Sequence, residues 1–500
     1  MPLPAELKPL PDARFDADCA RHLLNRAGFG GTPQQVQALA GLGLAKAVDR
    51  LVKYEPLTYK DSGADDFDKD IIRPLTDEER RTQFQARRAN DEATLQKFER
   101  ERNRRQADDR EQFREMQKWW LKRMIESPRP LEEKMTLFWH GHFATGYRTI
   151  EDSWHMYQQN QMFRRFATGN FAQLVRAVVR DPAMIKYLDN DENRKGKPNE
   201  NLARELMELF TLGEGRGYTE QDIKEGARAL TGLTFRDDEG VFLIDQHDGG
   251  HKTILGYGGA IDADRFVDLI LARKECPEFI CTKLYRFLVN DAPGELAPDQ
   301  KAFVKGMSKL LVDSKAELKP VLRAVFMSEH FHHPANRGAI IKGPVQLIVQ
   351  AVRQFHTPVR ELSVLASAAD LMGQNLFQPP NVKGWDGGRG WINTSTLFTR
   401  QNLLVYLLTG RSPRMQEWDS SEQGFDARHL VDGARTPNGT LTATDGVTWL
   451  LRCSLATATM PERVQAISQC MDSRKLSLDS NEGVIEALCL ITALPEFQLC

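Results

Sequence analysis

Residues 77 to 125 leave this chain few ways to fold, because acids and bases alternate there with few apolar residues between them. The sparse apolar positions are Leu95, Phe98, Phe113, Met116 and Trp120. This pattern predicts one or two long helices whose surfaces are mostly solvated, and the Trp119–Trp120 pair marks their entry into the core. Interleaved charges favour a solvated helix over a nucleic-acid-binding arm.

Helix signals also dominate on both sides of this segment. Residues 17 to 53 predict a helical hairpin whose second helix opens with Thr32 as N-cap and Pro33 at the first helical position. Thr219 has the sequence context of a capping box. Residues near 233–245 give the clearest β signal, two short apolar stretches around an acidic, Gly-containing turn. We therefore expect a mainly α protein, a large multi-helix orthogonal assembly with one small β-hairpin and a long charged helix.

The chain divides into five expected parts. They are an N-terminal helical hairpin region (1–76), a long charge-rich helical segment (77–126), a main helical core that holds the hairpin and the candidate site (127–410), a connector (411–446) and C-terminal closing helices (447–500).

Charge and composition restrict the expected partners and compartment. A net charge of −2 gives no reason to expect nucleic acid as a partner. The sequence has no run of about 18 apolar residues, so no membrane span is expected. The cysteines form no CxxC pair, which favours reduced thiols. The N-terminal sequence does not resemble a signal peptide, so the chain as given is expected to be cytoplasmic, and a removed leader would leave export open.

Two acids interrupt the apolar pattern PNENLARELMELFTLG at 198–213. If this stretch is a regular α-helix, Glu205 points into the buried arc of leucines and Glu208 lies on its margin. An unpaired buried carboxylate is costly, so Glu205 must be neutralised, hydrogen-bonded to a fixed donor or coordinated to a cation. A structural ion pair with an arginine such as Arg228 is the simpler alternative.

The stretch EEKMTLFWHGHFATG at 132–146 supplies two histidines. On a helix, His140 and His142 point to different sides; if the chain extends between them, both imidazoles lie on one side. Together with Glu205 and Glu208 they would form a mixed nitrogen and oxygen site for one divalent transition metal ion, zinc, iron or manganese. Without metal, the same groups can act as general acid and base. Histidines whose hydrogen bonds are satisfied in the core are the alternative.

Two loops supply further candidates. In QHDGGHKTILG, His247 and Asp248 can converge on a site as catalytic residues, and a polar turn held by Asp248 is the alternative. In QPPNVKGWDGGRGWINT, aromatic faces on a glycine-rich loop can stack on a sugar ring or a cation, or they can fill the core beneath the loop. The candidate substrate-binding residues are Lys383, Trp385, Trp391 and Asn393.

Several long strings, taken in order, resemble a known bacterial family. They include RHLLNRAGFG, PLEEKMTLFWHGHFATG, PNENLARELMELFTLGEG, YTEQDIKEGARALTG, HDGGHKTILG and QPPNVKGWDGG, and the resemblance spans nearly the whole chain. The family is that of uncharacterised proteins known as domain of unknown function 1800. The resemblance implies a mostly helical protein, often encoded beside an alkaline-phosphatase-like or sulfatase-like protein that is a candidate partner. It also implies that many relatives are exported.

These patterns predict two alternative functions. The first is a hydrolase-like enzyme, metal-dependent or carboxylate-based, that acts on a polymer or polysaccharide. Its catalytic candidates are Glu205, Glu208, His247 and Asp248. The alternative is a non-enzymatic binding or assembly partner of the co-encoded alkaline-phosphatase-like protein, with residues 77–118 as the docking surface.

Overall fold

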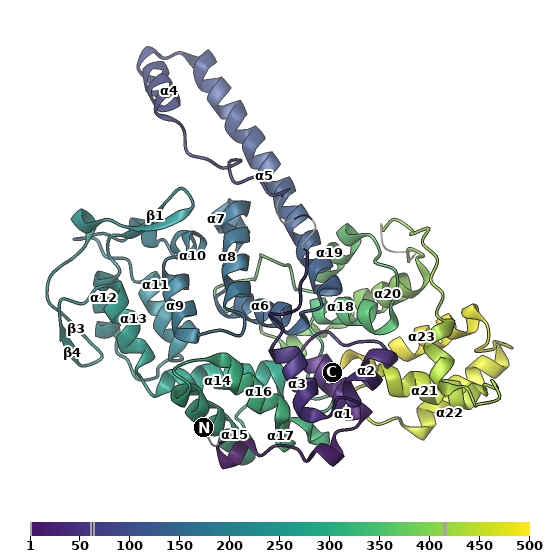
Figure 1. Cartoon of the computed structure of the whole chain (residues 1–500). Coiled ribbons are helices and arrows are strands. Elements are labelled where there is room, and N and C mark those ends of the chain that lie inside the picture. Colours follow the sequence, from purple (N-terminus) through teal and green to yellow (C-terminus); the bar gives the residue numbers. More distant parts are fainter. Residues whose placement is uncertain (1–2, 61–62, 64–65, 414–417) are drawn as a thin grey trace.

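The computed structural model describes residues 3–60, 63, 66–413 and 418–500. Within these ranges the protein is mainly α-helical, as predicted, and its β structure consists of two separate two-stranded antiparallel sheets (Figure 1). Parts of the predicted N-terminal region 1–76 and of the predicted connector 411–446 lie outside the described residues.

Three helices form the N-terminal region: α1 (Ala17–Arg26), α2 (Pro33–Ala40) and α3 (Leu44–Val52). The Thr32 hydroxyl accepts a hydrogen bond from the Gln35 amide and Pro33 occupies the first helical position, so the predicted helix start is confirmed. The second helix expected in this hairpin is split into α2 and α3. The chain turns between them at Gly43, whose φ of 74° lies in the left-handed region that glycine tolerates.

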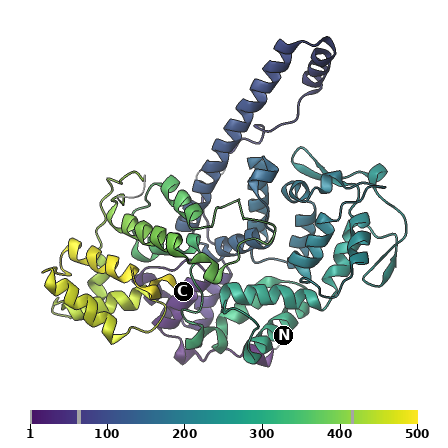
Figure 2. The ribbon, with the colours of Figure 1, turned by 180° about the vertical axis from the view of Figure 1, so that it is seen from behind.

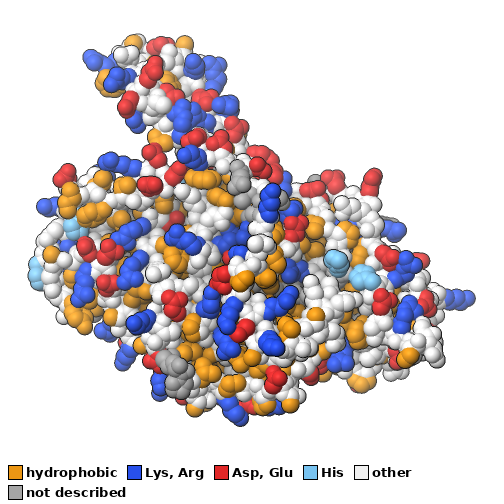
Figure 3. Space-filling model, in the orientation of Figure 1, with side chains coloured by type: hydrophobic (Ala, Val, Ile, Leu, Met, Phe, Trp, Pro, Cys, Tyr) orange, Lys and Arg blue, Asp and Glu red, His pale blue; other side chains and the backbone are white. Residues whose placement is uncertain are grey.

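The charge-rich segment forms a projecting helical arm. It contains α4 (Asp77–Ala89) and α5 (Glu92–Glu126), joined at Asn90 in a left-handed conformation. Figure 1 shows α5 running from the tip of the arm into the body, and Figure 3 shows basic and acidic side chains mixed over the arm's surface. The long charged helix is confirmed, and Trp120 is fully buried where α5 enters the core, as predicted.

A run of helices follows the arm. They are α6 (Pro130–His142), α7 (Tyr147–Ile150), α8 (Ser153–Arg165), α9 (Phe171–Val179), α10 (Pro182–Tyr187), α11 (Asn201–Glu205), a π-helical segment (Leu206–Thr211) and α12 (Glu220–Ala229). The Thr219 hydroxyl accepts a hydrogen bond from the Asp222 amide at the start of α12, which confirms the predicted capping box.

Two β-hairpins come after α12. Strand β1 (Leu233–Arg236) pairs with β2 (Glu239–Phe242) in the register that places Arg236 opposite Glu239, which confirms the hairpin predicted near 233–245. Strand β3 (Lys252–Ile254) pairs with β4 (Tyr257–Gly259) in a second hairpin that the sequence patterns do not predict. Its strands are too short and too rich in glycine to show the alternation by which strands are recognised.

The remaining helices complete the chain. They are α13 (Ala263–Leu271), α14 (Glu275–Leu288), α15 (Pro298–Asp313), α16 (Leu318–Met327), α17 (Glu329–His332), α18 (Pro344–Phe355), α19 (Leu362–Leu371), α20 (Thr394–Thr409), α21 (Ala443–Ser454), α22 (Pro461–Ser473) and α23 (Asn481–Thr492). Figure 2 shows from behind that α20 to α23 lie on one side of the body and the two hairpins with α9 to α13 on the other. The predicted closing helices correspond to α21, α22 and α23.

The helices pack around two hydrophobic cores. The first joins the N-terminal helices to α6 and to the helices from α9 to α16. The second joins the base of α5 to the helices from α18 to α23. Helix α6 lies between the two, since its Leu131 belongs to the first core and its Leu137 to the second. Its C-terminal end is therefore where elements from both halves of the chain meet.

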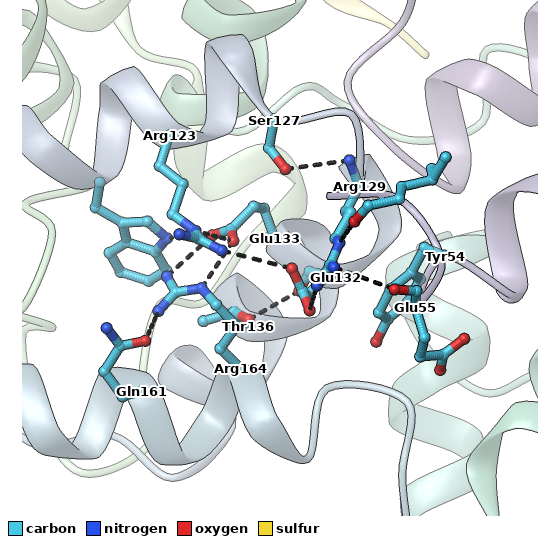
Figure 4. Close-up of polar contacts among 12 residues, drawn as sticks. Tyr54, Glu55, Arg123, Ser127, Arg129, Glu132, Glu133, Thr136, Gln161 and Arg164 are labelled. Carbon is cyan, nitrogen blue, oxygen red and sulfur yellow. Dashed lines mark hydrogen bonds and ion pairs between the residues drawn. The ribbon is translucent and has the colours of Figure 1, made fainter. Parts of the chain in front are cut away.

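A buried ion network fixes α5 on α6 and α8 (Figure 4). Glu133 is fully buried and accepts hydrogen bonds from Arg123 Nε at 2.5 Å, Arg164 Nε at 2.7 Å and Trp120 Nε1 at 2.9 Å. Burial alone would raise the pKa of Glu133, but the two guanidinium groups outweigh it and hold the pKa below its ordinary value. Burial raises the pKa of the neighbouring Glu132, and the charge of Glu133 raises it further.

The sequence also makes predictions about the cysteines and about membrane spans. All seven cysteines are free thiols, and burial raises the pKa of Cys276 and of Cys281 to about 12. Among the helices of the described ranges, none is long and apolar enough to cross a membrane.

Candidate functional site

The acidic motif at 198–213 is not one regular helix. Helix α11 ends at Glu205, and in the π-helical segment that follows the Leu212 amide donates a hydrogen bond to the Met207 carbonyl. The projection at 100° per residue therefore fails beyond Glu205, because a π-helix has more residues per turn. The position of Glu205 differs accordingly from the prediction: its side chain is half-buried, whereas Phe210 is fully buried.

The two acids of this motif form a local pair. Burial raises the pKa of Glu205, and the neighbouring Glu208 carboxylate raises it further. Glu208 accepts a hydrogen bond from Arg204 Nη1 at 3.2 Å. Arg228, the alternative partner considered for Glu205, is engaged elsewhere, since its Nε donates to the Asp248 carboxylate at 2.7 Å.

The HGH motif is helical, and its two histidines have different neighbours. His140 Nε2 accepts a hydrogen bond from the Phe377 amide at 3.0 Å. His142 Nε2 donates to the Phe210 carbonyl at 2.9 Å, and its Nδ1 accepts from Lys283 Nζ at 3.2 Å. Burial lowers the pKa of His140 to about 3 and that of His142 well below its ordinary value, so both rings are neutral at pH 7.

The four predicted metal ligands therefore do not converge. Both ring nitrogens of His142 are engaged with other groups, and His140 is hydrogen-bonded to a different segment. In the part of the chain that the structure describes, no group of three or more His, Cys, Asp or Glu side chains is placed to hold a metal ion. The residues present do not fit a shared zinc, iron or manganese site, and the metal ion stays a prediction from the sequence.

His247 and Asp248 hold a polar turn. The Asp248 carboxylate accepts hydrogen bonds from Arg228 Nε at 2.7 Å and from the Gly250 amide at 2.9 Å. The hydrogen bond from Arg228 is the main cause that lowers the pKa of Asp248 to about 2. His247 Nδ1 donates to the Thr231 carbonyl at 2.8 Å. Both side chains thus join the loop to the end of α12, which is the structural alternative considered for this motif.

The tryptophan loop (residues 381–393) docks closely on the end of α6. Gly384 has a φ of +82°, and a Cβ built there would lie 2.0 Å from the Gly141 carbonyl oxygen. A Cβ at Gly141 would lie 3.5 Å from the Trp385 ring. The Trp385 ring meets His140 edge-on, with ring centroids 5.4 Å apart. Glycine at position 384 therefore lets the loop lie directly on the α6 backbone, whereas a Cβ at position 141 would make only an ordinary contact with Trp385.

A cleft of about 740 Å³ opens between the tryptophan loop, the end of α6 and α14. Lys383, Trp385 and Trp391 line it, so three of the four predicted substrate-binding residues share one cleft. The fourth, Asn393, caps α20 by accepting a hydrogen bond from the Thr396 amide at 2.9 Å. The loop identified from its sequence is therefore one wall of a cavity large enough for a small-molecule ligand.

Two carboxylates line this cleft, Asp291 and Asp386. Burial raises the pKa of Asp291, and nearby guanidinium groups partly offset the rise. Asp291 lies against the tryptophan loop, since a Cβ built at Gly388 would be 3.5 Å from its Oδ2. The predicted catalytic acids Glu205 and Glu208 are not among the residues that line the cleft.

Basic side chains dominate the charge of the cleft. Three buried ones, which we call the basic floor, are Arg26, Lys134 and Lys342. Four others that line it are Lys283, Arg286, Lys383 and Arg389. The opposing negative charges come from the side chains of Asp291 and Asp386 and from Cys500, the last residue of the sequence. The described lining therefore has an excess of positive charge, and a cleft with low-dielectric walls concentrates its field.

Three lysines of the cleft have pKa values below the ordinary value of lysine. Burial lowers the pKa of Lys134 and of Lys283 to about 8, and that of Lys342 to about 7. Lys283 Nζ donates to two neutral acceptors, His142 Nδ1 at 3.2 Å and the Leu209 carbonyl at 3.4 Å. Because Leu209 belongs to the π-helical segment, this lysine joins the acidic motif to the HGH motif. Among the described residues, none of the three lysines forms an ion pair with a carboxylate.

The sequence does not predict the basic residues of the cleft, because they come from separate parts of the chain. Arg26, Lys134 and Lys342 lie more than a hundred residues apart and share no motif. One signal is nevertheless present on α14. Lys283 follows Phe279 by four residues and precedes another phenylalanine by four, which places a charge within an apolar helical face.

Comparison with known proteins identifies the family. The chain belongs to the family described as protein of unknown function (DUF1800), whose model matches residues 22–499. No curated protein and no solved structure gives a significant match to the chain. The resemblance seen in the sequence motifs is confirmed over nearly the whole chain.

Proposed function

We propose that the cleft binds a saccharide chain and that the protein is a hydrolase-like enzyme acting on a polysaccharide. One observation carries this proposal: two indole rings and two carboxylates line the same cleft. The half-buried rings of Trp385 and Trp391 offer flat apolar faces on which a sugar ring can stack. Carboxylates beside such faces are the groups that glycoside hydrolysis requires.

The two carboxylates differ in a way that suits this reaction. Asp291 is partly buried and has a raised pKa, so it is the group that keeps its proton to higher pH and donates it to the leaving oxygen. Asp386 is exposed, so its carboxylate can accept the proton of an attacking water. The sequence-based prediction of a carboxylate hydrolase is thus kept, with Asp291 and Asp386 in place of Glu205 and Glu208.

Release of reducing sugar from a panel of polysaccharides tests this function. We expect Asp291→Asn and Asp386→Asn each to lower kcat by about 10²–10⁴-fold, because each removes a proton-transfer group. Trp385→Ala should mainly raise KM, because it removes a binding face. Glu205→Gln and Glu208→Gln are matched controls that should keep wild-type activity. Loss of activity in these two controls, with full activity in Asp291→Asn, would show that the acidic motif is catalytic.

A second candidate function is assembly with the co-encoded alkaline-phosphatase-like protein that the family resemblance implies. The arm favours it, because α4 and the outer part of α5 extend away from the body and expose Phe84, which is 61% accessible (Figure 1). Asp109 marks where the anchored part of α5 begins, since it accepts hydrogen bonds from Tyr147 Oη at 2.7 Å and from Ser153 Oγ at 2.6 Å.

Co-purification of the neighbouring protein tests this second function. The full chain should retain the partner, and a chain in which a short linker replaces residues 77–105 should lose it, because the docking surface is gone. Circular dichroism of the shortened chain checks that the body remains folded. Equal retention by both chains would exclude the arm as the docking surface.

A further inference from the structure

We propose that the saccharide bound in this cleft is acidic, and that the basic floor of Arg26, Lys134 and Lys342 is the subsite for one of its oxyanion groups. This inference rests on the proposed function for the sugar ring and adds the charge of the substrate. The oxyanion is a carboxylate or a sulfate ester, two groups that guanidinium and ammonium donors recognise by the same chemistry.

Arg26 has donors that the protein does not use. Its side chain is 1% exposed, and its Nη2 donates to the Asn336 carbonyl at 2.7 Å. Its Nε and Nη1 are buried and have no hydrogen-bond partner. Burial lowers the pKa of Arg26, and the negative charges of Cys500 and Asp291 act against this effect. A buried guanidinium with unused donors and no ion pair is costly, and a bound oxyanion would remove that cost.

The two lysines of the floor are also without a carboxylate partner. Lys134 Nζ donates to the Gln346 side chain, and the charge of Arg26 lies close enough to depress its pKa. Lys342 Nζ donates to the Phe497 carbonyl at 2.7 Å. The negative charge of Cys500 opposes burial at both lysines without forming a hydrogen bond or ion pair with them. Long flexible stems allow both amines to turn toward an arriving anion.

Further basic residues along the cleft suit a ligand with several negative charges. Lys283 and Arg286 project from α14, and Lys383 and Arg389 come from the tryptophan loop. Lys383 is exposed, and its nearest carboxylate is Glu214 at 3.8 Å. Positive charge therefore continues from the floor along the aromatic wall, as a chain of acidic sugar units requires. A neutral saccharide would leave this excess of buried charge without compensation.

Calorimetric titration of the full chain tests the inference. The ligands are a uronic-acid oligosaccharide, its carboxyl-reduced neutral counterpart of equal length and a sulfated oligosaccharide. We expect at least one acidic ligand to bind about 10-fold tighter than the neutral one or better, which corresponds to 1.4 kcal/mol. The difference should shrink in high salt, since part of it is electrostatic.

Variants of the basic floor test whether these residues cause the preference for acidic ligands. Arg26→Gln should abolish most of the preference for acidic ligands and leave the affinity for the neutral one within twofold. Arg360→Gln is a matched control, because Arg360 is also buried, at 2% exposure, and also has an unpartnered nitrogen, but does not line the cleft. It should keep the preference. If Arg26→Gln does not fold, Lys134→Gln tests the same subsite.

The outcomes separate this inference from the proposed function. Equal binding of acidic and neutral ligands, lost in Trp385→Ala, would overturn the acidic subsite and keep the saccharide site. Sulfate that stabilises the wild type against heat but not Arg26→Gln, without binding of any saccharide, would keep the anion subsite and overturn the saccharide function. An unchanged acidic preference in both floor variants would overturn the assignment to Arg26 and Lys134. Among the acidic ligands, the tighter one identifies the oxyanion.

Discussion

Glu133→Gln tests whether one buried carboxylate holds the arm on the body. Glu133 accepts four hydrogen bonds, two from Arg164 and one each from Arg123 and Trp120. An amide keeps only one acceptor oxygen and turns an NH₂ group toward donors that the other oxygen served. It also removes the carboxylate paired with Arg164, whose side chain is 6% exposed, and one of the two paired with Arg123, whose side chain is 9% exposed and whose other partner is Glu132 at 3.6 Å. Removal of one partner from a buried ion pair costs about 3–5 kcal/mol, and we expect a loss of this size.

The adjacent Glu132 is a matched control for this change. It is also buried, but its Oε2 has no hydrogen-bond partner, and the charge of Glu133 contributes to its raised pKa. Neutralising Glu132 removes this repulsion together with two long ion pairs, to Arg129 at 3.3 Å and to Arg123 at 3.6 Å, so the gain and the loss largely offset each other. Glu132→Gln should therefore leave the free energy of unfolding within about 1 kcal/mol of the wild-type value, because a glutamine oxygen can still accept the hydrogen bond from Arg129.

Urea unfolding followed by tryptophan fluorescence measures both variants. With a denaturant dependence of about 3 kcal/mol per molar urea, the expected loss in Glu133→Gln lowers the unfolding midpoint by roughly 1 M or more. Hydrogen exchange at the base of α5 should accelerate in the same variant, since this carboxylate joins α5 to α6 and α8. Equal losses in Glu132→Gln and Glu133→Gln would refute the argument, because bulk burial and not specific pairing would then decide the cost.

Three further changes follow from other parts of the structure. Burial raises the pKa of Asp181 from its ordinary 3.8 to about 6, so the stability that its protonated form provides at low pH is lost as the pH rises through 6. The urea midpoint of Asp181→Asn should therefore depend less on pH between pH 4 and pH 8 than that of the wild type. Gly384→Ala should weaken ligand binding in the cleft at least tenfold by calorimetry, because its Cβ would meet backbone at 2.0 Å, whereas Gly390→Ala, with its nearest contact at 3.6 Å, should not. Calorimetry should show that the affinity for an acidic oligosaccharide falls between pH 7 and pH 9, because Lys134 and Lys283 lose their protons near pH 8. The free protein should become more stable toward pH 10, because the pKa values of both lysines are lower in the folded state than in the unfolded state.

Local signals in the sequence predict much of the fold. The caps at Thr32 and Thr219 and the hairpin near 233–245 each depend on a few neighbouring residues, so they can be found without tertiary information. The arm can be predicted because its interleaved charges exclude it from a core. The π-helical segment after Glu205 cannot be found in this way, since it depends on partners for its carbonyls that come from α6 and α14.

The candidate site is predictable only in part, for the same reason. The tryptophan loop carries its own signal in glycine and aromatic spacing, and it does line a cleft. The rest of the cleft comes from segments far apart in the chain, and no local pattern brings Arg26 beside Lys134. A helical wheel detects a charge on a buried face, but only the tertiary structure shows whether a partner meets it.

The three lysines of the cleft with lowered pKa values should take up protons when an anion binds beside them. Lys342, with a pKa of about 7, and Lys134 and Lys283, with pKa values of about 8, are partly deprotonated at pH 8 in the free protein. An oxyanion bound beside them stabilises the charged amines and raises their pKa values, so binding at pH 8 must take up protons. Calorimetric titration in buffers of different ionisation enthalpy measures this uptake, and we expect between one and two protons per ligand at pH 8 and fewer at pH 6. Binding of an acidic ligand without proton uptake at pH 8 would mean that the anion sits away from these lysines, and the cleft would then need another account of its buried positive charge.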